Sequence, residues 1–357
     1  MDIKATPYSN LKVFTHFDKL KSIKDGTRTA PVYIRLKPTN VCNHHCYYCS
    51  YADSDLALRD DVNPKDSIPW PKMQEIIDDM GSMGVKGVTL SGGGEPLVYD
   101  HIVETMESLL EKGIDLSIIT NGQLLSGEAA KTLCRAKWVR ISFDSASGEV
   151  YSKIRGIPVG SFDKVCENIG NFARIKPKEC ELGINFVINH ENAHQVYEVA
   201  KLVRDLGVNH IKYTTRITKD LDNYHQPFKA DAVEQIHRAK SELTREGFIV
   251  INKYEEDFEF STVFKRVYSK CYAKEFLTII AADCKVYFCH DKAYVKSGVV
   301  GDLKERSFKE LWFSPEVYER YRNFNAQEEC CHHCVYDDRN MMLNSFFSLD
   351  DNHINFI

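Results

Sequence analysis

Three cysteines lie within eight residues of one another and could together bind a metal. The stretch CNHHCYYC places Cys42, Cys46 and Cys49 in a C-x3-C-x2-C spacing. Zinc usually takes four ligands, so a zinc site here would need His44 or His45 as the fourth. Three thiolates on one loop also suit a 4Fe–4S cluster in which one iron has no protein ligand. The spacing alone leaves both metals open.

The remaining cysteines of the twelve fall into two sets. Three are scattered through apolar, periodic segments, where a small buried thiol is the better interpretation; they are Cys134, Cys166 and Cys180. The other six lie near the C-terminus: Cys271, Cys284, Cys289, Cys330, Cys331 and Cys334. A second group of this density predicts a second metal site.

Composition limits the class of protein and its surroundings. The chain has 357 residues, 43% of them hydrophobic and 27% charged, as in ordinary globular proteins. A net charge of -5 and no basic run argue against a nucleic-acid partner. The N-terminal sequence has no signal-peptide core, and no apolar run approaches the roughly 20 residues that span a bilayer. We expect a cytosolic protein, without membrane association, in which clustered cysteines bind metal rather than form disulfides.

Short β-rich runs alternate with helical periodicity between about residues 32 and 217. The predicted strands are 32–38, 87–93, 115–122, 138–145, 182–189 and 210–217. The predicted helices between them are 72–84, 101–113, 128–137, 162–175 and 192–207. Repeated βα units predict a parallel sheet, and six units are too few to close an eight-fold barrel. We therefore expect an α/β fold, an open partial (β/α)6 TIM barrel with ligands at the C-terminal ends of its strands.

The pattern changes after the sixth strand. Residues 231–246 resemble one more amphipathic helix, and 248–253 one more strand. Residues 276–291 predict a β-hairpin that turns near Ala282 and Asp283. The expected domains are an N-terminal extension, the barrel, a connecting helix and strand, a small C-terminal domain and a tail. Their ranges are 1–30, 31–225, 226–270, 271–340 and 341–357.

A second motif, SGGGEP, ends the second predicted strand. Glycines there allow close backbone approach or positive φ, and a carboxylate can bind an ammonium group. With C-x3-C-x2-C after the first strand, this arrangement resembles the radical S-adenosylmethionine (radical SAM) superfamily over most of the chain. The resemblance implies that Cys42, Cys46 and Cys49 hold a 4Fe–4S cluster whose free iron chelates S-adenosylmethionine.

The same resemblance suggests further contacts with S-adenosylmethionine. Tyr48 would lie beside the adenine, and Gly93, Gly94 and Glu95 would hold the methionyl amino group. A second set of contacts comprises Ser142 at the ribose, Asp144 on the same face, Arg155 at the cofactor carboxylate and Asn189 at the ribose or adenine. The alternative role of these four residues is strand-end capping and turn chemistry.

The C-terminal cysteines resemble the twitch or SPASM extension of the family, which gives the small domain an α+β fold. The seven-cysteine SPASM pattern is incomplete, because no cysteine follows Cys334. The four-cysteine twitch form implies one auxiliary 4Fe–4S cluster held by Cys271, Cys289, Cys331 and Cys334. Either of the adjacent Cys330 and Cys331 could be the ligand, and the spacing to Cys334 favours Cys331. Taken without the barrel, the two pairs could also form a zinc ribbon.

Cys284 occupies the place where related hairpins have glycine. It is either a small buried replacement or a thiol that gives a hydrogen atom to a substrate radical. Candidates for a general base on the sixth strand are His210, Tyr213 and Arg216.

The implied reaction is reductive cleavage of S-adenosylmethionine to a 5′-deoxyadenosyl radical, which removes a hydrogen atom from the substrate. We expect an oxidoreductase that dehydrogenates a small hydroxylated, sugar- or cyclitol-like molecule, with the auxiliary cluster as electron acceptor. Epimerisation with Cys284 as donor, and peptide or protein maturation, are the alternatives; the 41 residues before Cys42 are short for a leader-binding domain. An external donor such as flavodoxin or ferredoxin is the implied partner. The mixed charges of 214–230 indicate no phosphate site.

Overall fold

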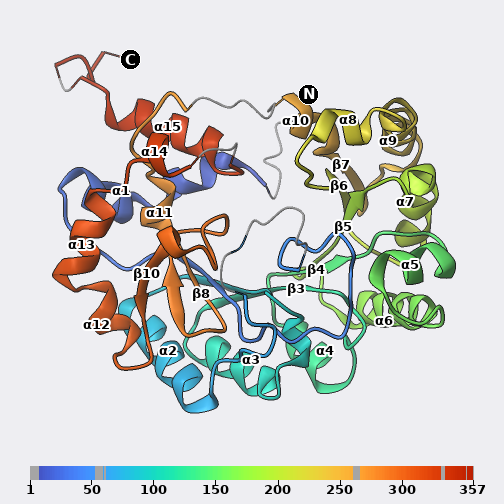
Figure 1. Cartoon of the computed structure of the whole chain (residues 1–357), viewed down its shortest axis with the longest axis horizontal. Helices are drawn as coiled ribbons and strands as arrows, with labels where there is room; N and C mark the ends of the chain where they lie inside the picture. The colour runs from blue at the N-terminus through green and yellow to red at the C-terminus, as the bar shows by residue number, and fades with distance from the viewer. Residues whose placement is uncertain are drawn as a thin grey trace.

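The computed structural model describes residues 8–52, 59, 62–259, 266–330, 334–350 and 352–356 (Figure 1). The strands are β1 Tyr33–Leu36, β2 Gly87–Leu90, β3 Asp115–Thr120, β4 Trp138–Ser142, β5 Glu181–Ile188, β6 His210–Thr215, β7 Ile249–Asn252, β8 Leu277–Ile280, β9 Lys285–Tyr287 and β10 Val299–Asp302. The longer helices of the barrel region are α2 Trp70–Met83, α3 Ile102–Glu111, α4 Gly127–Leu133, α5 Gly148–Arg155, α6 Ser161–Ile175, α7 Val196–Asp205 and α9 Lys229–Leu243.

Shorter or terminal helices complete the described chain. They are α1 Phe17–Lys24, α8 Leu221–His225, α10 Tyr254–Glu259, α11 Ala273–Phe276, α12 Phe308–Trp312, α13 Pro315–Arg322, α14 Ala326–Glu329 and α15 Asp337–Phe347. Single 3-10 turns are η1 Asn10–Thr15, η2 Pro96–Val98, η3 Ala193–Gln195 and η4 Lys296–Gly298. No helix within the described ranges is long and apolar enough to cross a bilayer.

One sheet of ten strands runs through the molecule in the order β10-β9-β8-β1-β2-β3-β4-β5-β6-β7. β8 and β1 to β7 run parallel to one another, and β9 and β10 add antiparallel strands beside β8. Figure 1 shows the sheet curving from β10 round to β7, with α2 to α7 on its outside. The mixed α/β fold with an open parallel barrel is confirmed.

The sheet is larger than the six predicted strands. β7, predicted as part of a connector, pairs with β6, and β8 of the predicted hairpin pairs in parallel with β1. Hydrogen bonding therefore crosses the expected boundary between the barrel and the C-terminal domain. The sequence shows that these strands exist but not which edge each one joins, because their pairing is non-local. The domain ranges stay a prediction.

Alternation along the strands separates a packed face from a concave one. Ile34 and Leu36 of β1 are fully buried in the main core between sheet and helices, whereas Tyr33 and Arg35 point to the other face. Because parallel strands share one direction, the segments after β1, β2, β3 and β4 all leave the sheet at the same edge. The predicted cysteine loop and glycine motif therefore meet there.

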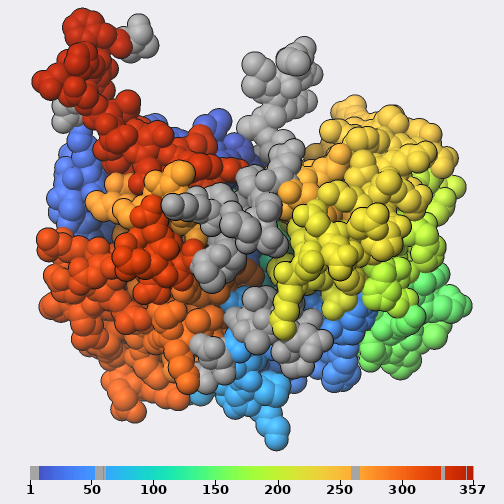
Figure 2. Space-filling model, turned by 45° about the horizontal axis from the view of Figure 1, so that its top comes forward, coloured from blue at the N-terminus to red at the C-terminus, as the bar shows by residue number. Residues whose placement is uncertain are grey.

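The C-terminal part lies across that edge from the β6–β7 region. In Figure 2 the helices near the C-terminus (red) and the segment with α8 and α9 (yellow) lie on opposite sides of the face shown.

Candidate functional site

The first cysteine loop follows β1 and is anchored by the end of α5. His45 N–H donates to the Arg155 carbonyl (2.8 Å), and Tyr47 N–H donates to the Ile154 carbonyl (3.3 Å). The next residue, Gly156, has φ +61°, and a Cβ there would lie 2.8 Å from the His45 carbonyl oxygen. Only glycine fits this close approach in a left-handed conformation. Because α5 is short, helical periodicity did not predict it.

The end of β3 holds the same loop from another side. The Asn121 amide donates to the Asn43 side-chain oxygen (2.7 Å), and the His44 imidazole lies 2.6 Å from the Gln123 side-chain oxygen. Asn121 and Gln123 were not singled out from the sequence, although the polar run after a buried strand was the available signal. His44 is thus engaged with a side chain of the barrel.

The triple glycine lies against the entry of the cysteine loop. A Cβ on Gly93 would lie 2.0 Å from the Asn40 side-chain oxygen, and one on Gly94 would lie 2.0 Å from the Val41 carbonyl oxygen. Gly94 N–H also donates to the Thr39 carbonyl (3.1 Å). These glycines do not have positive φ, so close backbone approach alone requires them.

Glu95 is buried, and its carboxylate connects the glycine loop to the segment at the end of β3. It accepts hydrogen bonds from Thr120 Oγ1 (2.6 Å), Asn121 N–H (2.7 Å) and Leu97 N–H (3.1 Å). Burial raises the pKa of this carboxyl group, and these donors oppose the rise. Glu95 therefore has a structural role in addition to any contact with a ligand.

A buried ion pair lies beneath the cysteine loop. Arg155 pairs with Asp144, which also accepts a hydrogen bond from the Tyr48 hydroxyl. Asp144 further accepts the N–H of Val187 (2.9 Å), and Arg155 Nη1 lies 3.5 Å from the Cys46 sulfur. Burial raises the pKa of the Cys46 thiol, and the guanidinium opposes that rise. The structure thus brings together residues predicted from three separate segments.

Two other predicted cofactor residues, Ser142 and Asn189, differ in burial and in their hydrogen-bond partners. Ser142 is half-buried at the end of β4, in register with Asn185 of β5. Asn189 is fully buried, and its amide donates to the Val187 carbonyl (3.0 Å) while its oxygen accepts Glu191 N–H (3.0 Å). Because both ends of its amide serve the turn after β5, turn chemistry is the better interpretation of Asn189.

For three of the predicted catalytic residues, the structure shows partners other than the cysteine loop. Cys284 has φ +60°, which explains the glycine usual there, and its thiol is buried in the main core. Tyr213 is also in the core, where its hydroxyl donates to the Val196 carbonyl (2.6 Å). His210 begins β6 at the opposite edge of the sheet and lies 3.0 Å from Glu181 and 3.1 Å from Tyr8. The structure therefore does not bring these three side chains to the cysteine loop, and their catalytic role stays a prediction.

Arg216 does lie at the carboxyl edge, directly after β6. Its guanidinium lies over the rings of Tyr47 (4.8 Å) and Tyr224 (5.0 Å). It therefore remains a candidate contact for a molecule bound beside the cysteine loop.

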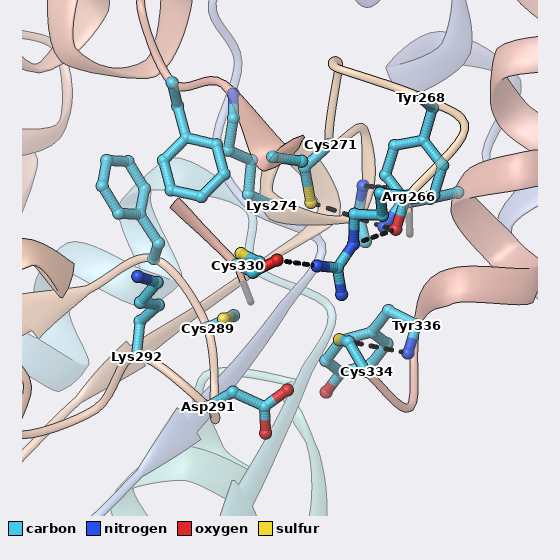
Figure 3. A pocket seen from close by; sticks show the side chains of 15 residues that line it. Arg266, Tyr268, Cys271, Lys274, Cys289, Asp291, Lys292, Cys330, Cys334 and Tyr336 are labelled. Carbon is cyan, nitrogen blue, oxygen red and sulfur yellow. Dashed lines mark hydrogen bonds between the residues drawn. The ribbon is translucent and has the colours of Figure 1, made fainter. Parts of the chain in front are cut away.

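Four thiols line a second site in the C-terminal part (Figure 3). Cys271, Cys289, Cys330 and Cys334 line one cavity, and burial raises the pKa of every one of these thiols. In the described part of the chain, no three His, Cys, Asp or Glu side chains converge as the ligands of one metal ion do. A 4Fe–4S cluster is larger than one ion, so its ligands stand around a space, as these do.

One observation bears on whether Cys330 or Cys331 is the fourth ligand of the second site. Cys330 lines the cavity, whereas Cys331, the predicted ligand, lies outside the described residues. The Asn340 amide lies 3.4 Å from the Cys271 sulfur, and Tyr336 N–H lies 3.4 Å from the Cys334 sulfur. N–H donors to thiolate sulfurs influence the reduction potential of a cluster that the thiolates hold.

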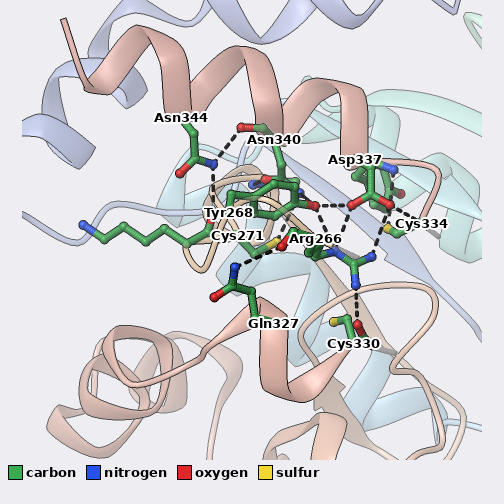
Figure 4. Close-up of polar contacts among 12 residues, drawn as sticks. Arg266, Tyr268, Cys271, Gln327, Cys330, Cys334, Asp337, Asn340 and Asn344 are labelled. Carbon is green, nitrogen blue, oxygen red and sulfur yellow. Dashed lines mark hydrogen bonds and ion pairs between the residues drawn. The ribbon is translucent and has the colours of Figure 1, made fainter. Parts of the chain in front are cut away.

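A buried pair also organises this second site (Figure 4). Arg266 and Asp337 form a two-pronged ion pair, with distances of 2.9 and 3.2 Å. Arg266 donates to the Cys330 carbonyl, and Asp337 accepts Cys334 N–H (2.6 Å). Tyr268 donates to Asp337. The pair therefore fixes the chain at two of the four thiols.

Tyr294 connects the two sites. Its hydroxyl donates to the Asn40 side-chain oxygen and would lie 3.1 Å from a Cβ on Gly93. It is buried, with φ +60°, five residues after Cys289. The C-terminal part thus contacts the glycine loop directly.

Comparison with known sequences agrees with this geometry. The family model described as "Radical SAM superfamily" matches residues 36–203, and the one described as "Iron-sulfur cluster-binding domain", SPASM, matches residues 271–335. This chain belongs to the radical SAM superfamily. The first match contains the cysteine loop, the glycine loop and Arg155. The second match contains all six C-terminal cysteines.

Individual relatives of this radical SAM protein are distant. An AdoMet-dependent heme synthase of Methanosarcina barkeri is 22% identical over 86% of this chain and 89% of its own. A probable GTP 3′,8-cyclase of Saccharolobus islandicus is 31% identical, but the match spans 50% of this chain and 54% of the cyclase. The chain therefore spans about half the length of that cyclase.

Solved structures show the same fold at low identity. Streptococcus suis SuiB bound to S-adenosylmethionine superposes with a TM-score of 0.60 at 19% identity, covering 91% of this chain and 75% of SuiB. The protein anSMEcpe with bound AdoMet superposes with a TM-score of 0.58 at 16% identity, covering 89% and 97%.

A radical SAM protein with a SPASM domain uses S-adenosylmethionine and 4Fe–4S clusters, and polar atoms beside the first cysteine loop fit such a cofactor. Arg155 Nε and Ser91 Oγ are buried there without a hydrogen-bond partner among the described residues. The glycine loop leaves room where a Cβ would collide. The four C-terminal thiols fit a second cluster.

Proposed function

We propose that this radical SAM enzyme is an oxidoreductase that removes a hydrogen atom from a small molecule held inside the barrel. The net reaction would be a two-electron oxidation. The observation that carries this proposal is the enclosed four-thiol site, which contacts the glycine loop through Tyr294. A cluster with four thiolate ligands has no open iron, which suits electron transfer better than substrate binding.

In this proposal the first site holds the cofactors. Cys42, Cys46 and Cys49 ligate the first cluster, and Gly93 and Gly94 let the backbone come close to the methionyl end of S-adenosylmethionine. When bound and reduced, these cofactors supply an organic radical that takes a hydrogen atom from a C–H bond. Arg155, whose Nε lacks a partner, donates to the cofactor carboxylate.

Other residues orient this machinery. Asp144 holds Arg155 and Tyr48 in place, so that Tyr48 lies beside the adenine. Ser142, half-buried at the end of β4, would contact the ribose. Arg216, stacked on Tyr47, would contact the substrate from the end of β6. The concave face of the sheet excludes water around the reacting bond.

The second proposed site has Cys271, Cys289, Cys330 and Cys334 as its ligands. We choose Cys330 over Cys331 because its side chain lines the cavity. The cysteines of this site would hold a group able to take the one electron that the substrate radical loses, while the proton of its hydroxyl group leaves to solvent. An external reductant such as a flavodoxin or ferredoxin would supply the first site.

Peptide modification is the second candidate. Structures of SuiB bound to the precursor peptide SuiA and of anSMEcpe with bound Kp18Cys peptide share this fold, with TM-scores of 0.61 and 0.56. The heme synthase relative supports a small-molecule substrate instead. Epimerisation with Cys284 as hydrogen donor is not proposed, because that thiol is in the core.

The test is formation of 5′-deoxyadenosine by the anaerobically reconstituted full chain with reductant and S-adenosylmethionine. One tube receives the small-molecule fraction of a source-cell extract, and another receives the macromolecular fraction. Stimulation by the first fraction supports the proposal, and stimulation by the second alone supports peptide or protein modification. The variant with Cys42, Cys46 and Cys49 all changed to Ala is the control and should give none.

A further inference from the structure

The concave face of the sheet carries three cations on three different strands. They are Arg35 of β1, Arg140 of β4 and Lys212 of β6. The residues on either side of each in the sequence are buried on the helix side of the sheet. Strand alternation therefore turns all three side chains toward the inside of the barrel.

These cations face one another although their strands are far apart in the sheet. β1 and β6 are five strand spacings apart in the order, about 24 Å in a flat sheet. The curvature seen in Figure 1 brings them close enough for Arg35 and Arg140 each to act electrostatically on Lys212. Burial lowers the pKa of Lys212 well below its ordinary value, and Arg140 lowers it further.

Compensating groups are few among the described residues. The ammonium group of Lys212 lies 5.2 Å from the Tyr8 ring centroid, and the carboxylate that acts on it is that of Asp257. Asp257 already accepts two hydrogen bonds from Thr215 (2.9 and 2.8 Å). The guanidinium of Arg140 hydrogen-bonds Tyr8, but its Nε is buried without a partner among the described residues. The three cations are half-buried, and a single carboxylate compensates their charge only in part unless a ligand pairs with them.

The metal clusters do not explain these charges. Lys37, at the cysteine-loop end of β1, already donates to the Tyr51 hydroxyl (2.7 Å) and to the Gly92 carbonyl (2.9 Å) beside the first site. Arg140 and Lys212 lie within β4 and β6, away from the edge at which the cysteine loop leaves the sheet. Their partner is therefore expected deeper in the barrel than the cysteine loop.

We propose that Arg140 and Lys212, with Arg35 nearby, bind an anionic oxygen group of a small-molecule substrate, a phosphate or a carboxylate. This inference rests on the proposed function and names its substrate class. Arg140 precedes Ser142 by two residues, so it lies about 6.6 Å deeper along β4 than the cofactor edge. The anionic end of the substrate then lies deep in the barrel, and its reacting C–H bond faces the cofactor. A hydroxylated sugar- or cyclitol-like molecule without an anionic group would leave these cations without such a partner.

Calorimetric titration of the anaerobically reconstituted full chain tests this inference. The probes are inorganic pyrophosphate and citrate, which represent phosphate and carboxylate chemistry. The proteins are the wild type, Arg140→Gln, Lys212→Gln, Lys212→Arg and, as a matched control, Lys240→Gln on the exposed face of α9. Thermal unfolding of each variant without anion is measured in parallel.

We expect at least one probe to bind the wild type and to bind Arg140→Gln and Lys212→Gln about tenfold or more weakly. Lys212→Arg and Lys240→Gln should bind it as the wild type does. The two glutamine variants should unfold at the wild-type temperature or above, because a repelling charge is removed. The probe that binds more tightly shows whether the anionic group of the substrate is a phosphate or a carboxylate.

Two results would overturn the inference: no binding to the wild type, or equal binding by all variants. Lower unfolding temperatures for both glutamine variants together with unchanged anion affinity would assign the cations a structural role instead. Formation of 5′-deoxyadenosine is measured on the same wild-type sample. Cleavage without anion binding rejects this inference alone, and anion binding without cleavage rejects the proposed function alone.

Discussion

Two cysteine sites in one chain are each organised by a buried arginine–aspartate pair, but they hold their cysteines in different ways. At the first site, Arg155 and Asp144 lie under three cysteines of one short loop, and Cys42 is exposed. At the second, Arg266 and Asp337 join cysteines from separate segments around an enclosed cavity. One site is open to a small molecule, and the other is closed by the protein.

The donors of the two arginines account for this difference. Arg155 keeps Nε without a partner in the described structure and points Nη1 at the Cys46 sulfur. Arg266 donates to Asp337, Tyr268 and the Cys330 carbonyl, all within the protein. The same type of ion pair thus leaves one arginine donor for a ligand at the first site, whereas at the second site it uses its donors to close the site.

The largest effect should separate the two sites by activity. Cys46→Ala should lower 5′-deoxyadenosine formation by more than about 100-fold, because even residues outside the ligand shell of a metal contribute 10- to 100-fold. Cys289→Ala should retain most of this cleavage without substrate but lose substrate oxidation. The comparison is made by chromatography of 5′-deoxyadenosine and of substrate. Equal loss of cleavage in both variants would mean that the two sites do not act separately.

Iron content should identify the fourth ligand of the closed site. Cys330→Ala should lose about half of the iron of the reconstituted protein, one cluster of two. Cys331→Ala is the matched control and should keep its iron. Iron and sulfide assays measure this directly, and the opposite order would return the assignment to Cys331.

Breaking the closed site's ion pair should cost stability. Arg266→Met leaves Asp337 charged and buried, with an expected loss of about 3–5 kcal/mol in the free energy of unfolding. Arg238→Met removes an exposed pair with Glu242 and should leave the free energy of unfolding nearly unchanged. Urea denaturation of the cluster-free protein measures both. A similar small loss in the two variants would show that Arg266 is not needed for the fold.

The open site should be sensitive to a single methyl group. Gly94→Ala places a Cβ 2.0 Å from the Val41 carbonyl oxygen, so the loop must move, at about 1–3 kcal/mol. Gly160→Ala has open space around it and should change stability by about 0.5 kcal/mol or less. Affinity for S-adenosylmethionine, from equilibrium dialysis, should fall in the first variant only. An unchanged affinity would show that the close approach does not shape the cofactor site.

The smallest effect is expected at Cys284, which belongs to neither site. Cys284→Gly relieves a left-handed conformation worth about 1–2 kcal/mol but removes a buried thiol. The net change in unfolding free energy should stay within about 1 kcal/mol, and substrate turnover should not change. A large loss of turnover at unchanged stability would restore the hydrogen-donor role.

Local patterns in the sequence predicted the elements that build the open site. The cysteine spacing, the glycine loop and the six strands depend on near neighbours along the chain, and the two loops lie at one edge of the sheet that the strands form. The pairing of β8 with β1 could not be predicted, since 244 residues separate Tyr33 from its partner Leu277.

The candidate catalytic residues that do not contact the cysteine loop differ from expectation in the direction of their side chains. Tyr213 and His210 are three residues apart on β6, so alternation already places them on opposite faces, and His210 at the beginning of the strand lies at the far edge. The core position of Cys284 depends on a positive φ in the hairpin turn, which no pattern for a non-glycine residue indicates.

The pairing of β8 with β1 also bears on the order of events during synthesis. The strand that leads into the first cysteine loop is made early, yet one of its two hydrogen-bonding edges waits for residues 277–280. Contacts this distant in the sequence form late and slow the folding of the whole sheet. Until then, the exposed edge of β1 is a place where nascent chains can associate. Insertion of the first cluster is therefore expected to follow release of most of the chain from the ribosome.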